Sequence, residues 1–242
     1  MQACCQPMRP TADDVRRGLP RAVGVGIRQL SEAELHPPTL YPLEAEALGP
    51  LATERRRAFF ALGRTAARDA LLELGIPHAA ICRGPAGEPL WPPGTVGAIT
   101  HARDLAVAVV GRQTDYAGLG VDVEELARGP TPRAARLVCR PTEMEWVNVE
   151  AGTERLTMLF SAKEAVFKAL FPIERVWLGF ADAELTWWAD RGRFSARVLK
   201  SIGAGYPAGL VLDVNCMVAD GLVLTTAFVE AGTRDDAEHR NS

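Results

Sequence analysis

The stretch FSAKEAVFKAL, residues 160–170, has the apolar spacing of a helix that packs against a hydrophobic core. Glu164 and Lys168 lie along the edge of its apolar face, and Lys163 falls within that face. As an ordinary surface pair, Glu164 and Lys168 would contribute a few tenths of a kcal/mol and no chemistry. However, only three of the 27 basic residues are lysines, and two of these three stand in this helix. Because a flexible ammonium suits phosphate, we predict a phosphate site here.

The bulk composition predicts a globular cytoplasmic protein. Its 242 residues are 48% hydrophobic, which is enough for a sizeable core in one large domain or two small ones. The formal net charge of −3 argues against a nucleic-acid partner but leaves room for a local basic patch. The sequence shows no secretory leader and no apolar run of about 18 residues, so we expect no membrane contact. The five cysteines lack metal-ligand spacing and are expected to be free thiols.

Polar ends and a repeated pattern outline the predicted domains. Residues 1–20 and 231–242 are polar or charged, so we predict loose tails there. Between them, residues 21–116 and residues 117–230 each offer a long helix and several strands. This similarity predicts an internal repeat of two α+β halves, although the halves share little sequence identity.

Apolar periodicity predicts the elements of each half. Residues 53–74 have a helical pattern that ends at Gly75, and residues 128–153 suggest short helices. Gly24 and Gly26 lie in the first predicted strand and do not form a dinucleotide loop, because no third glycine opens a helix. Strands are predicted in residues 21–30, 96–100, 105–110, 119–124, 183–188, 194–199, 210–217 and 222–229.

Carboxylates converge in the strand LGVDVE, residues 119–124. The strand period of two places Asp122 and Glu124 on one face. Two acids alone would not identify a metal, since such pairs are common on sheet surfaces. With Glu164 as a third acid and lysines beside it, the group could support magnesium, which takes one or two carboxylates plus substrate phosphates. Glu125 points the other way and is predicted to be a bystander.

Basic residues mark further candidate surfaces. Arg57, Arg64 and Arg68 share one face of the first long helix, which is either solvated or binds an anion. His101 stands at a strand end, where a lone histidine is more often structural than functional. Four arginines and then an acidic segment occupy residues 128–153, which form either a solvated loop or a partner surface.

Four motifs, taken together and in order, resemble the Sfp-type 4′-phosphopantetheinyl transferases, in particular the branch of siderophore-synthetase component D. The motifs are RRRAFFALGRTAAR at 55–68, RGPAGEPLWPPGTVGAITH at 83–101, GVDVEE at 120–125, and FSAKEAVFKALFP running on into WLGF. The resemblance implies an α+β pseudo-dimer of two similar subdomains, each a small antiparallel sheet packed with a long helix. It also implies that coenzyme A binds in the cleft between them and that the chain is a monomer.

The resemblance implies a role for each matching position. Asp122, Glu124 and Glu164 would hold magnesium, or manganese, against the pyrophosphate of coenzyme A. Lys168 would contact the same pyrophosphate. Lys163 would line the site beside the metal, where it either lowers the cost of leaving-group charge as a catalytic residue or only snorkels from the apolar face. The adenosine end, with its 3′-phosphate, would be surrounded by Arg57, Arg64, Arg83, Thr100 and His101.

The implied reaction is attack by a serine of an apo acyl or peptidyl carrier protein on the β-phosphorus, which releases 3′,5′-adenosine diphosphate. Carrier domains of fatty-acid, polyketide or nonribosomal peptide synthases would be the partners. Glu164, or water on the metal beside it, would accept the serine proton. The sequence departs from the family after His101, where Asp104 could pair with Arg103 or His101 and alter the phosphate pocket.

Two alternatives stay open. A metal-dependent phosphodiesterase or nuclease also combines acids with a lysine, but its lysine usually follows the acid by two residues rather than four. The negative net charge also disfavours a nucleic-acid substrate. The other alternative is an inactive carrier-protein-binding relative, and the complete set of three acids with Lys168 argues against lost activity.

Overall fold

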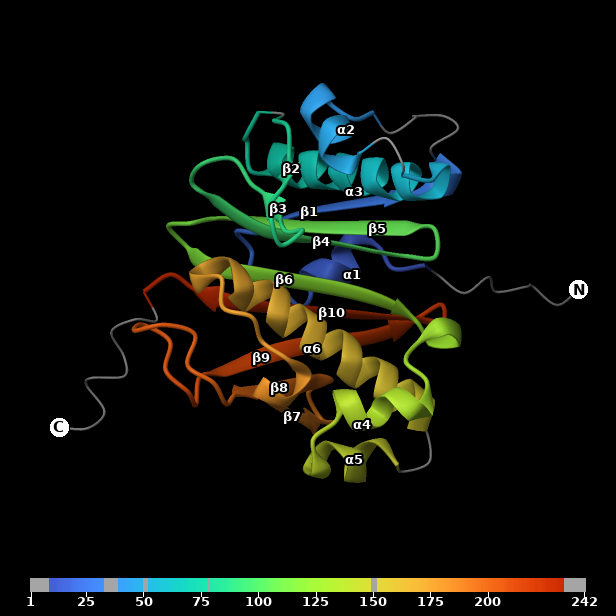
Figure 1. Cartoon of the computed structure of the whole chain (residues 1–242), viewed down its shortest axis with the longest axis vertical. Coiled ribbons are helices and arrows are strands. Elements are labelled where there is room, and N and C mark those ends of the chain that lie inside the picture. The colour runs from blue at the N-terminus through green and yellow to red at the C-terminus, as the bar shows by residue number, and fades with distance from the viewer. Residues whose placement is uncertain (1–8, 33–38, 50–51, 78, 149–151, 233–242) are drawn as a thin grey trace, which may run out of the picture.

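A computed structural model describes residues 9–32, 39–49, 52–77, 79–148 and 152–232 (Figure 1). In chain order its helices and strands are α1 (Ala12–Arg16), β1 (Gly24–Gln29), α2 (Pro42–Leu48), α3 (Glu54–Glu73), β2 (Cys82–Arg83), β3 (Pro89–Leu90), β4 (Thr95–Ala102), β5 (Leu105–Arg112), β6 (Tyr116–Glu125), α4 (Ala135–Val138), α5 (Pro141–Val147), α6 (Gly152–Glu174), β7 (Ala183–Trp188), β8 (Arg193–Val198), β9 (Val211–Ala219) and β10 (Leu222–Glu230).

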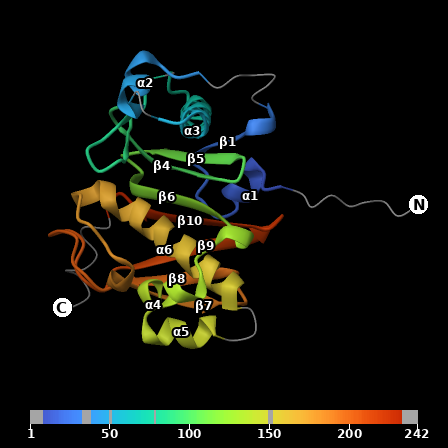
Figure 2. The same cartoon turned by 45° about the vertical axis from the view of Figure 1, so that its right-hand side comes forward.

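Two antiparallel sheets confirm the predicted α+β class. The first sheet has the order β1-β5-β4, and the second has the order β6-β10-β9-β8-β7. The turned view in Figure 2 shows α3 nearly end-on over the first sheet, with β6 following beneath β4. Each half therefore pairs one antiparallel sheet with one long helix, as predicted. The predicted boundary between residues 116 and 117 falls at the start of β6 and stays a prediction.

In the N-terminal half, two glycines allow α3 to lie directly on β1. A Cβ atom at Gly24 would collide with the carbonyl oxygen of Ala70, and one at Gly26 would collide with that of Ala66. Side chains longer than hydrogen would force the helix away from the sheet. The glycines noticed in the sequence thus serve helix packing.

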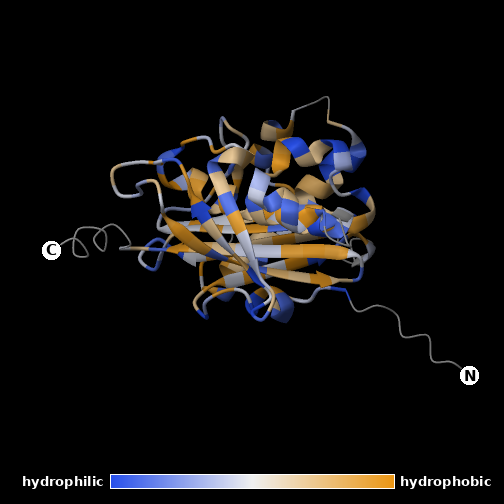
Figure 3. Ribbon diagram, turned by 90° about the horizontal axis from the view of Figure 1, so that it is seen from below, coloured by the Kyte–Doolittle hydropathy of each residue, from blue (hydrophilic) through white to orange (hydrophobic). Residues whose placement is uncertain are grey.

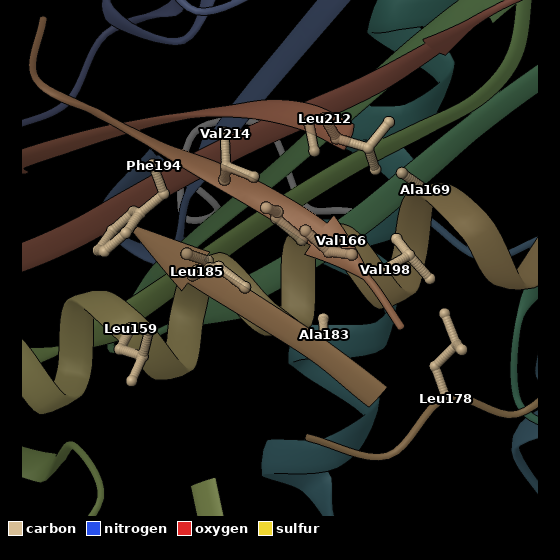
Figure 4. Close-up of a cluster of buried hydrophobic side chains, with 14 of the residues drawn as sticks. Leu159, Val166, Ala169, Leu178, Ala183, Leu185, Phe194, Val198, Leu212 and Val214 are labelled. Atoms are coloured by element: carbon tan, nitrogen blue, oxygen red, sulfur yellow. The ribbon is translucent and has the colours of Figure 1, made fainter. Parts of the chain in front are cut away.

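The C-terminal half repeats this contact. A Cβ atom at Gly118 or Gly120 in β6 would collide with the carbonyl oxygens of Ala169 and Ala165 in α6. Beyond β6, the helix covers a buried cluster that includes Leu159, Val166, Phe194 and Val214, and Figure 4 shows these side chains gathered between helix and sheet.

The two halves share a core between their sheets. Buried residues from β1, β4, β5, β6 and β10 form this cluster, and Val15 of α1 joins it with none of its surface exposed. Figure 3 shows that the strands at the centre of the view are largely hydrophobic, whereas many surrounding loops are more hydrophilic. The burial of both sheets against each other holds β4 beside β6.

The prediction of a loose tail is wrong for residues 9–20. Thr11 and Asp14 form a capping box that begins α1, and this helix buries Val15. The carbonyl oxygen of Gly18 accepts hydrogen bonds from Asn215 and Thr226 in the second sheet. Residues 1–8 and 233–242 lie outside the described residues. Within the described chain, no helix combines the length and the apolar composition that crossing a bilayer requires.

Candidate active site

Asp122 lies where the two halves meet, and it is only 3% exposed. The hydroxyl of Thr100, from β4, donates a hydrogen bond to Oδ1 of Asp122 at 3.2 Å. Nζ of Lys168, from α6, lies 2.6 Å from the same oxygen. The backbone N–H of Val123 donates to the Thr100 hydroxyl at 3.3 Å, so the two halves are joined at this point. The structure therefore brings together three of the predicted site residues.

The second carboxylate oxygen of Asp122 is unsatisfied. Its Oδ2 is buried and has no hydrogen-bond partner within the described part of the chain. An unpaired buried carboxylate oxygen costs free energy unless a ligand satisfies it. This oxygen is thus a candidate contact for a cation or for a hydrogen-bond donor.

Glu124 and Glu164 complete the acidic group. Burial raises the pKa of Glu124 to about 7, and the charges of Asp122 and Glu164 add to this rise while Lys168 opposes it. Burial also raises the pKa of Glu164, with Lys168 opposing the rise and Asp122 adding to it. The three carboxylates therefore share one electrostatic environment around a single ammonium group.

The acidic group offers few protein ligands to a metal. The described His, Cys, Asp and Glu side chains form no group of three positioned to hold a metal ion. Magnesium, however, often takes only one or two protein carboxylates, with substrate phosphates and water as its other ligands. The unsatisfied Oδ2 of Asp122 and the mutual repulsion of the carboxylates fit such a site.

Lys163 lies in a different environment from Lys168. Its ammonium, in a side chain that is 2% exposed, contacts Glu143 at 2.7 Å and donates to the carbonyl oxygens of Val138 and Phe180, each at 2.8 Å. An ammonium has three N–H donors, so these partners use all of them. The expectation that Lys163 lies beside a metal is therefore not supported by its contacts.

A basic cavity of about 500 Å³ borders α3 and the β2–β3 hairpin. We call it the arginine cavity; its charged and aromatic lining consists of Arg55, Arg56, Phe59, Phe60, Arg64, Arg83 and His101. Arg64 donates through Nε to the carbonyl oxygen of Ile81 at 2.6 Å, and its guanidinium lies 4.1 Å from the centre of the Phe60 ring. Burial lowers the pKa of Arg64 to about 10. The cavity presents one buried, hydrogen-bonded arginine and three exposed arginines to an anionic ligand.

His101 links the arginine cavity to the acidic group. Its ring stacks on Phe59, with the ring centres 5.2 Å apart. Partial burial lowers its pKa, and the charge of Lys168 lowers it further while Asp122 opposes this. The imidazole thus lies within electrostatic reach of both Lys168 and Asp122.

Arg57 is placed differently from its prediction. It is not among the described residues that line the arginine cavity, and its guanidinium donates to the carbonyl oxygens of Gly49 and Ala52, each at 3.2 Å. Arg55 and Arg56 line the cavity instead. The sequence spacing of Arg56 and Arg64 is compatible with a shared helix face. The structure shows that the β2–β3 hairpin lies over this face and encloses the cavity there.

Two smaller cavities lie near the arginine cavity. One of about 210 Å³, the lysine cavity, shares Gly87, Pro89 and Ile99 with it and contains Lys168. A second of about 210 Å³, the aromatic cavity, shares Phe167 with the lysine cavity and contains Glu164. The three cavities are thus neighbours: arginines line the first, Lys168 the second, and Glu164 with aromatic rings the third. A larger cavity of about 610 Å³ lies near the end of α6, and none of its described lining residues is a predicted site residue.

Sequence comparisons identify relatives of the chain. The chain is 39% identical over 215 residues to the 4′-phosphopantetheinyl transferase PptT of Mycobacterium tuberculosis, a match that covers 81% of this chain and 90% of the relative. It is 37% identical over 210 residues to the 4′-phosphopantetheinyl transferase Svp of Streptomyces mobaraensis, with 82% of each chain covered. The chain belongs to the 4′-phosphopantetheinyl transferase superfamily.

Further matches cover parts of this transferase. The model of the 4′-phosphopantetheinyl transferase N-terminal domain matches residues 44–111, and that of the 4′-phosphopantetheinyl transferase superfamily matches residues 118–211. Enterobactin synthase component D of Escherichia coli is 33% identical over 141 residues, covering 57% of this chain and 65% of that protein. The solved holo-[acyl-carrier-protein] synthase of Thermotoga maritima has a TM-score of 0.39 at 25% identity, covering 48% of this chain and 64% of that one. The relatives do not support the nuclease alternative.

The turn after His101 differs from its predicted pairing in this transferase. Asp104 pairs with Arg9 at 2.5 Å. Arg103 adopts a φ of 55° and lies 3.6 Å from Glu125 and 3.5 Å from Asp220. Glu125, predicted to be a bystander, thus takes part in a charged contact that joins the turns of the two halves.

Proposed function

We propose that this chain transfers the 4′-phosphopantetheine group of coenzyme A to a serine of an apo carrier protein and releases 3′,5′-adenosine diphosphate. The observation that carries the proposal is the position of Lys168. Its ammonium pairs with Asp122 and lines the cavity between the arginine cavity and Glu164. A pyrophosphate placed there would have fixed cations on one side and carboxylates on the other.

Coenzyme A fits the three neighbouring cavities by charge. Its 3′-phosphate and adenosine would lie in the arginine cavity, where Arg64 and Arg83 offer forked donors. Its pyrophosphate would contact Lys168 and His101. The uncharged pantetheine arm would then extend into the aromatic cavity, along Phe167 and past Glu164.

Charge stabilisation and positioning supply the catalysis. The serine oxygen forms a bond to the β-phosphorus while the bond from that phosphorus to the bridging oxygen breaks, and the electron pair leaves with 3′,5′-adenosine diphosphate. Lys168 stabilises the charge that develops on the pyrophosphate. Glu164, whose pKa is raised by burial, accepts the serine proton.

We propose that magnesium, or manganese, binds in the acidic group of Asp122, Glu124 and Glu164 through one or two of these carboxylates, with substrate phosphates and water as its other ligands. When bound, the ion neutralises pyrophosphate charge. Asp122 contributes its unsatisfied Oδ2, and Thr100 keeps the carboxylate oriented through Oδ1. The site uses Thr100 from one half and Asp122 from the other half of the same chain, so we also propose that the protein acts as a monomer.

The deciding experiment is a transfer assay. The protein is incubated with coenzyme A, magnesium and a panel of apo carrier domains from fatty-acid, polyketide and nonribosomal peptide synthases. We expect one phosphopantetheine mass on the carrier serine and equimolar 3′,5′-adenosine diphosphate. No mass gain on any carrier would overturn the proposal, and DNA cleavage under the same conditions would favour the nuclease instead.

A further inference from the structure

The ion pair between Lys163 and Glu143 connects four segments around α6. Glu143, in α5, is 2% exposed and accepts hydrogen bonds from the backbone N–H groups of Arg140 and Leu185. Lys163 also donates hydrogen bonds to the carbonyl oxygens of Val138, in α4, and Phe180. One buried pair therefore ties α4, α5, the segment at Phe180 and the edge strand β7 to the long helix.

The N-terminal half contains the same construction. Glu44, in α2, is fully buried, pairs with Arg68 at 3.0 Å and accepts the N–H of Ile81. Arg64 donates to the carbonyl oxygen of Ile81, as Lys163 does to that of Phe180. Both short helices begin with proline and carry the buried glutamate at their third position. Lys163 alone makes two kinds of contact that α3 makes with two residues. In α3, Arg68 pairs with the buried glutamate and Arg64 donates to a backbone carbonyl oxygen.

This recurrence indicates a structural role for the buried glutamate–cation pair. Among its described residues, the N-terminal half has the buried glutamate–cation pair but no acidic group that matches Asp122, Glu124 and Glu164. A device present in both halves belongs to the way each long helix is joined to its surroundings. The ammonium of Lys163 also has all three donors occupied, so it has none to offer a phosphate.

The segments that Lys163 holds nevertheless border the site. Its stem lines the aromatic cavity with Glu164, and the wall of this cavity is formed by Trp177, Leu178, Gly179, Phe180 and Ala183. Leu137 of α4, next to the bonded Val138, is 77% exposed. Displacing Phe180 or Val138 would therefore change the aromatic cavity and the surface beside it without moving Lys168.

We propose that Lys163 is a positioning residue that, through Glu143, Val138 and Phe180, holds the wall of the aromatic cavity against the helix that carries Glu164. It does not touch the reacting atoms. The proposal rests on the proposed function in one respect, because the aromatic cavity is taken to receive the pantetheine arm.

A double-mutant cycle tests this role. Lys163→Met leaves the Glu143 carboxylate buried without its cation, and we expect the KM for coenzyme A to rise about tenfold while kcat stays within about threefold. The double variant Glu143→Gln/Lys163→Met buries no unpaired charge, so part of the loss in kcat/KM should be recovered. The recovery should be incomplete, because Gln keeps only one of the two oxygens that accept the backbone N–H groups of Arg140 and Leu185. Lys163→Arg should also retain most activity. A catalytic lysine would lose kcat in both Met variants without rescue, and that result would overturn the proposal.

Hydrogen exchange gives a readout that does not depend on turnover. Amides in residues 177–185 and 135–140 should exchange faster in Lys163→Met than in wild type and should regain protection in the double variant. The matched control is Lys168→Met, which removes the other lysine of α6: it should lower kcat without changing this exchange. If Lys163→Met does not fold, an inactive but folded double variant still overturns the proposal. A wild-type protein that lacks transfer activity refutes the proposed function, while the exchange data still decide the positioning role.

Discussion

The two halves of the molecule use one scaffold with opposite charges. In each half, a glycine pair on a strand meets an alanine pair on a long helix. Two residues after the second glycine stands Arg28 in β1 but Asp122 in β6, and the helix partner is Asp69 in α3 but Lys168 in α6. Both ion pairs have N···O distances of 2.6 Å. The strand and helix have exchanged the sign of the charge that each one carries.

Burial makes this exchange matter for function. The Arg28 and Asp69 side chains are 33% and 31% exposed, and both oxygens of Asp69 are bonded to Arg28. The Asp122 side chain is 4% exposed, has a cross-half bond from Thr100 and keeps one oxygen unsatisfied. A partly exposed pair contributes about 0–1 kcal/mol to stability, whereas a buried, incompletely satisfied carboxylate is able to bind a ligand.

The largest expected effect separates these two pairs. Asp122→Asn removes the charge that faces Lys168 and the proposed metal contact, so kcat/KM for transfer should fall by about 10²- to 10³-fold. The matched change Asp69→Asn, in the corresponding pair, should leave kcat/KM within about twofold and stability within about 1 kcal/mol. Steady-state kinetics and urea unfolding check both. Equal loss of activity in the two variants would contradict the assignment of a functional role to the Asp122–Lys168 pair alone.

The pH dependence of stability should reveal the raised pKa of Glu124 in the C-terminal half. Since the pKa of Glu124 is raised from 4.5 to about 7, the folded state binds this proton more tightly than the unfolded state. The stabilisation of the folded state by this proton is therefore fully present below pH 4.5 and is lost as pH rises through about 7. In EDTA, wild type should lose stability relative to Glu124→Gln between about pH 5 and pH 8, by less than the full shift implies because solvent screens the partly exposed carboxylate. Magnesium should reduce this loss, and parallel curves for the two proteins would contradict the expected shift.

Glycine substitutions should affect the halves alike. Gly26→Ala and Gly120→Ala each place a methyl group against a helix carbonyl oxygen, so each should lower the free energy of unfolding by about 1–3 kcal/mol. Urea unfolding of the two variants measures this. Tolerance at one site and a large loss at the other would show that the contacts are not equivalent.

Local periodicity accounts for what the sequence predicted. The strands, the two long helices and the shared face of Asp122 and Glu124 follow from spacings within a few residues. The α1 helix was also readable, because Thr11 and Asp14 have capping-box spacing ahead of Val15. The polar composition of residues 1–20 instead led to the prediction of a loose tail.

Contacts between distant segments account for what the sequence did not predict. Lys163 was assigned to the site because it neighbours Glu164, but its partner Glu143 lies 20 residues away on another helix. Arg57 has the right spacing on α3, yet the hairpin lies over the face of Arg56. Helical period identifies which residues share a face, whereas the tertiary fold decides what that face meets. The one available signal was the repetition of PLE at 42–44 as PTE at 141–143.

The smallest expected effect concerns an ion pair that joins the halves outside the repeated scaffold. Arg175, just after α6, lies 3.0 Å from Glu88 of the hairpin, and Glu88 borders the lysine cavity. Because the Arg175 side chain is 58% exposed, Arg175→Ala should raise the KM for coenzyme A by at most about threefold, with kcat unchanged. The matched control Arg191→Ala, which removes a similarly exposed arginine, should change neither constant. The rise should shrink in high salt, where the wild-type pair is already screened. A tenfold fall in kcat would instead mean that this contact sets the alignment of the halves around Asp122.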